Sequence, residues 1–140
     1  MDTNWQAQLS ELPGAAPLEL QHGEWWLSSA ELDVQAMARL MNSLGARLST
    51  MTGLALDGGE TTVLYHYLLD SNSINFKTRT RENRIASITP ISSSANWIER
   101  EIHDLFCVEF VGHPGLARLI RPEQVPPGLF REAPRPAAKP

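Results

Sequence analysis

Two consecutive segments between residues 62 and 80 restrict the fold more than any other part of the sequence. Residues 62–69 are apolar on both faces of an extended strand, which is typical of an interior strand packed on both sides. Residues 74–80 alternate strictly between inward apolar and outward polar side chains, and residues 70–73 have the composition of a turn. The outward side chains of the second segment are Asn75, Lys77 and Arg79. The pattern predicts an antiparallel pair at the centre of a sheet.

Further strands are predicted on both sides of this pair. Residues 18–27 predict a hairpin with a turn at His22-Gly23, because apolar residues flank that dipeptide. Residues 46–88 consist of short apolar segments separated by turn residues, which include Asp57-Gly58-Gly59. We therefore expect a meander of mainly antiparallel strands.

Two main helices accompany the strands. Ser28 and Glu31 have the spacing of a capping box, apolar residues then recur at steps of three and four up to Leu44, and Gly45 supplies the left-handed position that ends a helix. The second helix is expected from about residue 94 to 106, with a serine cap and an apolar face of Trp97, Ile98, Ile102 and Leu105. A short helix over residues 3–11, capped by Thr3 or Asn4, precedes them.

These elements predict a single α+β domain over residues 1–121, with a mixed, mainly antiparallel sheet and two main helices. Residues 122–140 contain six of the ten prolines, so they are expected to form an extended, proline-rich C-terminal arm outside the core. The length of 140 residues fits one domain with a real hydrophobic core.

Composition excludes several classes of function. The net charge of −4 argues against nucleic-acid binding, and the longest apolar run is far too short to span a membrane. A single cysteine, Cys107, cannot form an internal disulfide or a thiolate cluster, and no glycine-rich phosphate loop is present. We therefore expect no cofactor, no metal and no secretion signal.

The densest group of functional side chains lies between residues 96 and 104. With Trp97 taken as 0°, the helical period of about 100° per residue places Ile98, Ile102 and Leu105 between about 80° and 140°, in the apolar arc. It places the following on the outer, solvated face: Glu99, Arg100, His103 and Asp104. Glu101 falls inside the apolar arc instead, where a carboxylate needs a cation. The candidate partners for it are Arg118 and the strand cations Lys77 and Arg79. A small stand-alone acid–base or metal-dependent enzyme that uses Glu99, His103, Asp104 and His113 is an open alternative.

The alternating strand has a second interpretation besides solubility. Lys77 and Arg79 share its outward face and Arg81 follows in the loop, so these cations form a possible docking face for an acidic partner. His66 lies in the apolar strand with no second ligand at metal spacing, which favours a hydrogen-bonded structural residue over a metal ligand.

A motif in the C-terminal half carries a family resemblance. Glu99-Arg100-Glu101, then Asp104-Leu105-Phe106, and then His113 after six further residues resemble the signature of the C subunit of bacterial NADH:quinone oxidoreductase, respiratory complex I. Supporting similarities upstream include the segments 63–68 and 87–89, so the resemblance covers about residues 30–121. Three features differ from the family. Cys107 replaces a glycine, and Ala117 stands where a basic residue or proline is usual, with Arg118 one position later. The customary Leu-Arg-Lys-Asp ending is absent, and residues 122–130 stand in its place.

The resemblance implies an α+β subunit with no redox centre and no active site of its own. It would dock the large quinone-site subunit of the peripheral arm, beside the iron–sulfur subunit, on the cytoplasmic side of the inner membrane. Residues 122–130 are similar instead to subunits of energy-converting membrane-bound nickel–iron hydrogenases, in which the large partner would be the nickel–iron subunit. The signature residues expected to act at an interface or in locking the fold are Glu99, Arg100, Glu101, Asp104, His113 and Arg118.

Overall fold

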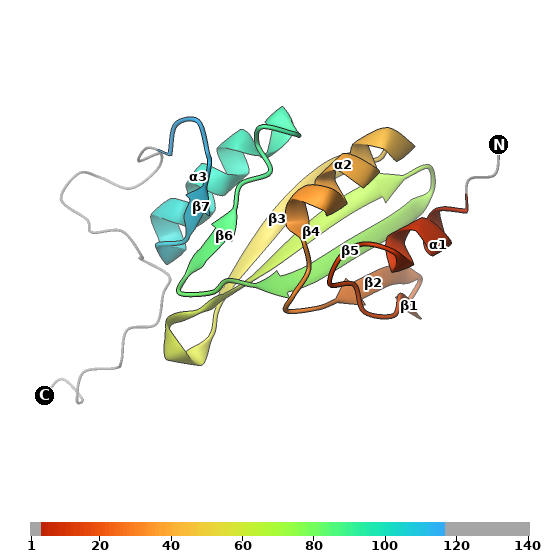
Figure 1. The fold of residues 1–140 in the computed structure, drawn as a ribbon, viewed down its shortest axis with the longest axis horizontal. Coiled ribbons are helices and arrows are strands. Elements are labelled where there is room, and N and C mark those ends of the chain that lie inside the picture. The colour runs from red at the N-terminus through yellow and green to blue at the C-terminus, as the bar shows by residue number, and fades with distance from the viewer. Residues whose placement is uncertain (1–3, 117–140) are drawn as a thin grey trace, which may run out of the picture.

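A five-stranded mixed sheet with strand order β1-β2-β5-β4-β3 forms the centre of the computed structural model, which describes residues 4–116 (Figure 1). The strands of this sheet are β1 (Glu19–Gln21), β2 (Glu24–Ser28), β3 (Arg47–Ala55), β4 (Thr61–Leu69) and β5 (Asn72–Arg79). A separate parallel pair is made by β6 (Arg84–Ala86) and β7 (Glu109–Val111). The helices are α1 (Trp5–Ser10), α2 (Val34–Leu44) and α3 (Asn96–Phe106), with 3-10 turns η1 (Asp57–Gly59) and η2 (Ser93–Ala95).

The predicted antiparallel pair is confirmed in the interior of the larger sheet. β4 and β5 run antiparallel, with Tyr65 opposite Phe76, and the chain turns between them at Asp70 and Ser71. β3 is antiparallel to β4, whereas β2 is parallel to β5, so the sheet is mixed but mainly antiparallel. The predicted hairpin is β1 and β2, in which His22 and Gly23 both have positive φ, as a tight hairpin turn requires.

All three helices pack on one face of this sheet. Trp5 of α1 meets Trp25 of β2 edge to face, with ring centroids 5.4 Å apart, on the same face as the buried Val63 and Tyr65. α3 lies against Gly53 of β3, where Phe106 occupies the space that a side chain would fill. The expectation that β4 is packed on both sides is confirmed only in part. On the face opposite the helices, Thr62 and Leu64 are buried, whereas Leu68 is 39% exposed. No helix within residues 4–116 covers this open face, and its side chains are largely polar.

The predicted start of the first main helix is also wrong. α2 begins at Val34, and Asp33 is its N-cap, since the Asp33 side chain accepts from the backbone N–H of Ala36. Ser28 still belongs to β2, where it pairs with Lys77. It is therefore part of the sheet and does not serve as the N-cap that the capping box predicts. The end of the helix is as predicted, because Gly45 adopts the left-handed conformation.

α3 ends on an unusual residue. Cys107 follows its last turn with φ 62°, a left-handed conformation that L-residues other than glycine seldom adopt. Its backbone N–H still donates to the carbonyl of His103. The serine cap expected at the other end is absent: Ala95 precedes the helix with no side-chain cap, and Ser93 and Ser94 belong to η2.

Cys107→Gly is expected to stabilise the protein by about 0.5–1 kcal/mol. Glycine removes the left-handed penalty of about 1–2 kcal/mol, and its greater freedom in the unfolded chain offsets part of that gain. Urea unfolding of the variant measures the difference. Cys107→Ala is the control, because alanine keeps the penalty. Equal midpoints for the glycine and alanine variants would contradict the argument.

None of the helices within residues 4–116 is long and apolar enough to cross a membrane. The predicted boundary at residue 121, the proline-rich arm over 122–140 and Arg118 all lie outside the described residues.

Candidate functional site

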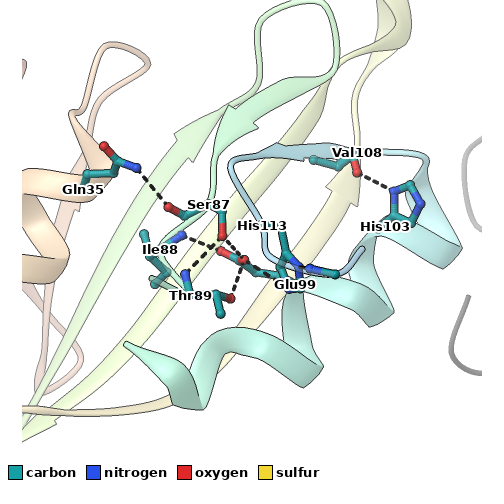
Figure 2. Close-up of polar contacts among 9 residues, drawn as sticks. Gln35, Ser87, Ile88, Thr89, Glu99, His103, Val108 and His113 are labelled. Carbon is teal, nitrogen blue, oxygen red and sulfur yellow. Dashed lines mark hydrogen bonds and ion pairs between the residues drawn. The ribbon is translucent and has the colours of Figure 1, made fainter. Parts of the chain in front are cut away.

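Glu99 of α3 is the centre of a buried polar cluster (Figure 2). Its side chain is fully buried, and one carboxylate oxygen accepts from the Ser87 hydroxyl at 2.6 Å and the Thr89 hydroxyl at 2.8 Å. The other oxygen accepts from the backbone N–H of Ile88 at 2.8 Å. Three donors from one short segment therefore compensate much of the cost of burying this carboxylate.

This geometry overturns the predicted orientation of the helix. The sequence pattern predicts Glu99 on the solvated face and Glu101 inside, but Glu99 is fully buried and Glu101 is only half-buried. Trp97, which the sequence pattern places on the apolar face, is 58% exposed. The predicted orientation is wrong because the inward face of the helix carries a carboxylate whose hydrogen-bond donors lie elsewhere in the chain.

His113 joins the cluster from the segment after β7. Its side chain is 1% exposed, and its Nε2 lies 3.9 Å from a carboxylate oxygen of Glu99. Its Nδ1 accepts from the backbone N–H of Gly115 at 2.9 Å, so the neutral imidazole carries its proton on the nitrogen that faces Glu99. The structure thus brings together two signature residues that are 14 positions apart in the chain.

The same cluster is tied to α2. The side-chain amide of Gln35 donates to the carbonyl of Ser87 at 3.2 Å, as Figure 2 shows. Glu99 and its partners therefore link α3, residues 87–89, the segment around His113 and α2. Ser87 and Thr89 were not predicted as part of a site. The sequence pattern that indicates these residues is a pair of hydroxyl side chains on either side of the apolar Ile88.

Two tyrosines of β4 face the region of Glu99 with neutral hydroxyls. The hydroxyl oxygens of Tyr65 and Tyr67 are buried and have no hydrogen-bond partner within residues 4–116. Burial raises the pKa of both side chains well above the usual range for tyrosine, and the charge of Glu99 raises it further. These phenols therefore stay protonated in the folded protein at pH values where an exposed tyrosine ionises.

The two phenols make stability depend on alkaline pH. In the unfolded chain they ionise near pH 10, whereas the raised pKa keeps them neutral when folded, so their contribution is present below about pH 10 and is lost as the pH rises. The loss is up to about 1.4 kcal/mol per pH unit for each tyrosine. In the double variant Tyr65→Phe/Tyr67→Phe, we expect stability at pH 7 within about 1 kcal/mol of wild type and a smaller decline between about pH 9 and 11. Thermal melts across this range test it, and identical declines would contradict it.

The remaining signature residues are arranged differently from expectation. Asp104 is fully buried rather than on a solvated face. The Arg100 guanidinium lies 5.9 Å from the centre of the Trp97 ring, and His103 bonds the carbonyl of Val108 at 2.9 Å instead of pairing with Glu99. Glu101 takes part in none of the ion pairs found among the described residues. The expected pairing of Glu101 with Lys77 or Arg79 is therefore wrong.

The cluster has the character of a structural centre. Its carboxylate is closed off from solvent and already accepts three hydrogen bonds. Across residues 4–116, no three His, Cys, Asp or Glu side chains converge in a way that could hold a metal ion. The arrangement suits holding helix, loop and sheet in a fixed relation.

The basic strand lies on the open face of the sheet. Lys77 and Arg79 are exposed, while Arg81 pairs with Glu31 at 2.5 Å, both side chains being mostly solvent-exposed. Asn75 also faces this side, but it is only 1% exposed. Its side chain accepts from His66 Nδ1 at 2.7 Å and donates to Glu24 at 2.9 Å.

The second ring nitrogen of His66 is bonded as well. Its Nε2 lies 3.0 Å from the hydroxyl of Thr52, so both nitrogens have partners within the sheet. The interpretation of His66 as a hydrogen-bonded structural residue is confirmed.

Comparison with known proteins gives the family. Residues 28–134 match the model of the family described as the 30 kDa subunit of respiratory-chain NADH dehydrogenase. The chain belongs to this family. The match includes Glu99, its donors and His113, and it agrees with the resemblance to the complex I C subunit that the sequence motif indicates.

Individual relatives support the membership. The NADH-quinone oxidoreductase C subunit of Ruegeria sp. is 32% identical over 111 residues, which cover 73% of this chain and 55% of the relative. The probable mitochondrial NADH-ubiquinone oxidoreductase 30.4 kDa subunit of Candida maltosa is 43% identical over 61 residues, or 41% of this chain and 22% of the relative. The chain thus spans about half or less of the length of these relatives.

Two solved structures share the fold. A trypsin-resistant fragment of Nqo5 aligns with a TM-score of 0.60 and 27% identity, covering 74% of this chain and 90% of the fragment. A chain of the membrane-bound sulfane sulfur reductase, an archaeal respiratory membrane complex, aligns with a TM-score of 0.66 over 76% of this chain and 68% of its own length. At 21% identity, the second likeness concerns the fold alone.

Proposed function

We propose that the chain is a non-catalytic, hydrophilic assembly subunit of a complex I-like oxidoreductase, which docks the large quinone-site subunit in the peripheral arm. The family match over residues 28–134 carries the proposal. The iron–sulfur subunit of the same complex is its second partner. The location is peripheral, on the cytoplasmic side of the inner membrane, where membrane contact occurs only through the complex.

The geometry supports two different roles for the signature residues, one in stabilising the fold and one in contacting a partner. Glu99 and His113 lie inside and lock the fold, because their side chains are buried against residues 87–89 and each other. Trp97 and Arg100 stack on the other side of α3, where Trp97 is 58% exposed, and Glu101 is half-buried beside them. This side of α3 is the part of the signature that a partner can reach.

The remaining signature residues and the tail belong to the same proposal. Asp104 serves in locking the fold, since it is fully buried, and Arg118 is assigned to the same group on the sequence motif. Residues 122–140 lie outside the described residues. We propose that they act as the proline-rich arm expected from the sequence, with Val125, Leu129 and Phe130 as its apolar anchors on the large subunit.

Affinity purification of the full chain from its native membrane tests the proposed function. We expect other proteins of the quinone enzyme to copurify, the large quinone-site subunit above all, because a docking protein is held by its partner. Trp97→Ala/Arg100→Ala should reduce this recovery at least about fivefold, since exposed tryptophan and arginine are the side chains that most often dominate an interface. Recovery of the chain alone, or with near-stoichiometric zinc, nickel or iron, would contradict the proposal and favour a stand-alone enzyme.

An energy-converting nickel–iron hydrogenase is the second candidate complex. Residues 122–130 resemble subunits of such hydrogenases, and this observation favours it. In that case the docked partner is the nickel–iron subunit. The same purification distinguishes the two complexes by the identity of the large subunit recovered.

A further inference from the structure

Three hollows lie end to end along the basic part of the molecule. The first, of about 250 Å³, and the second, of about 200 Å³, share Ala30 and Arg79 in their walls. The second and the third, of about 510 Å³, share Arg81, Arg84 and Ile85. Because adjacent hollows share lining residues, they lie next to one another in a row from the end of β5 to the β6–β7 pair. We refer to the three together as the basic groove.

Positive charge dominates this groove. Lys77, Arg79, Arg81 and Arg84 line it, against Glu31 and Glu82. Arg81 is neutralised by Glu31, and Arg84 pairs with Glu109 at 3.1 Å. Lys77 and Arg79 are exposed and have no ion pair within the described part of the chain. Arg79 is partly balanced by its electrostatic attraction to Glu60. The groove therefore presents two exposed cations that are not held in ion pairs, which favour an acidic occupant.

Apolar side chains are interleaved with these cations. Leu56 in the first hollow is 38% exposed and Val111 in the third is 43% exposed, while Ile85 is half-buried between the second and third. Exposed apolar surface beside unpaired charge is typical of a protein interface. A shallow, elongated groove of this kind fits an extended chain better than a small molecule.

We propose that the basic groove binds an extended acidic segment of a partner subunit. Carboxylates of that segment meet Lys77 and Arg79, and its aliphatic side chains meet Leu56, Ile85 and Val111. The inference deepens the proposed function and rests on it, because it assigns a chemistry to one surface that the partner complex occupies.

Charge argues against the other occupants. Residues 117–140 of this chain contain five basic and two acidic residues, so their net charge repels the groove. A nucleic acid is disfavoured because the groove interleaves its cations with aliphatic rather than aromatic side chains, and because the chain carries −4 overall.

Photo-cross-linking in the assembled complex identifies the occupant. The exposed Ala30, which borders the first two hollows, is replaced by p-benzoylphenylalanine in the full chain, and cross-linked peptides from native membranes are sequenced. We expect a segment of another subunit with more acidic than basic residues. A basic segment, residues 117–140 of this chain, lipid or nucleic acid at this position would overturn the proposal.

Charge reversal measures the contribution of the two exposed cations. K77E/R79E should reduce recovery of the cross-linked partner at least about tenfold, because glutamates then face the acidic segment. K77Q/R79Q should reduce it about threefold, because the attraction is lost but no repulsion is added. R39E/R47E is the matched control, since both arginines are exposed on α2 and β3 and the net charge changes equally. Its recovery should stay within about twofold of wild type.

The outcomes separate the two proposals. Equal recovery with K77E/R79E and R39E/R47E would overturn the groove while leaving the assembly role intact. An acidic cross-linked segment from a protein outside any complex I-like enzyme would contradict the assembly role while supporting the groove. Melting temperatures of all variants, measured on the purified chains, are expected to agree with wild type within a few degrees.

Discussion

Glu99→Ala is expected to lower the free energy of unfolding by about 3–5 kcal/mol. The substitution leaves the hydroxyls of Ser87 and Thr89 and the N–H of Ile88 without their acceptor in a site closed to water, and it opens a cavity. Urea unfolding followed by far-UV circular dichroism measures the loss.

Two further variants control this prediction. Glu101→Ala, from the same signature and the same helix, should change stability by no more than about 0.5–1 kcal/mol, since Glu101 is half-buried and has no ion pair among the described residues. Glu99→Gln should fall between the two, because the amide retains one acceptor oxygen. Equal, small losses for Glu99→Ala and Glu101→Ala would show that the buried cluster does not hold α3 in place.

Gly14→Ala is expected to cost about 3–4 kcal/mol. Gly14 has φ +79°, and an added Cβ would overlap the carbonyl group of Glu31, standing 2.6 Å from its carbon atom. The contact is with backbone, which has little freedom to move aside. The Gly14 carbonyl also accepts from the Ser29 hydroxyl, so displacing this turn separates α1 from the start of α2.

Gly23→Ala separates the two components of that cost. Gly23 has φ +81° but nothing within 4 Å of the added Cβ, so its variant reports the left-handed penalty of about 1–2 kcal/mol alone. The difference between the two midpoints in urea is then the cost of the overlap at Gly14. Matching midpoints would mean that the segment around Glu31 yields to the methyl group.

Local patterns predicted the elements whose geometry depends on neighbours in the sequence. The β4–β5 pair follows from alternation and a short turn, and the β1–β2 hairpin follows from His22-Gly23. The end of α2 at Gly45 follows from the one residue that enters the left-handed conformation without penalty. The α1 cap at Asn4 is likewise local, because its side chain accepts from the N–H three residues later.

The start of α2 depended on a distant strand. Ser28 and Glu31 have the spacing of a capping box, but β2 pairs in parallel with β5 as far as Ser28 and Lys77, nearly 50 residues apart. Those ladder hydrogen bonds hold Ser28 extended, and Asp33 caps the helix instead. A local capping pattern cannot show that its first residue is already used by a sheet.

By itself, the sequence determined the α+β class, the order of the helices and strands as far as α3 and the membership of the signature motif in its family, because periodicity, turns and motif spacing are properties of the chain. Tertiary structure decided which face of α3 turns inward. A helix with carboxylates at Glu99 and Glu101 does not show which one is buried, since the donors that compensate the cost come from Ser87, Ile88 and Thr89. Only folding brings those donors to Glu99, and their hydrogen bonds make burial of a carboxylate favourable where a tryptophan was expected.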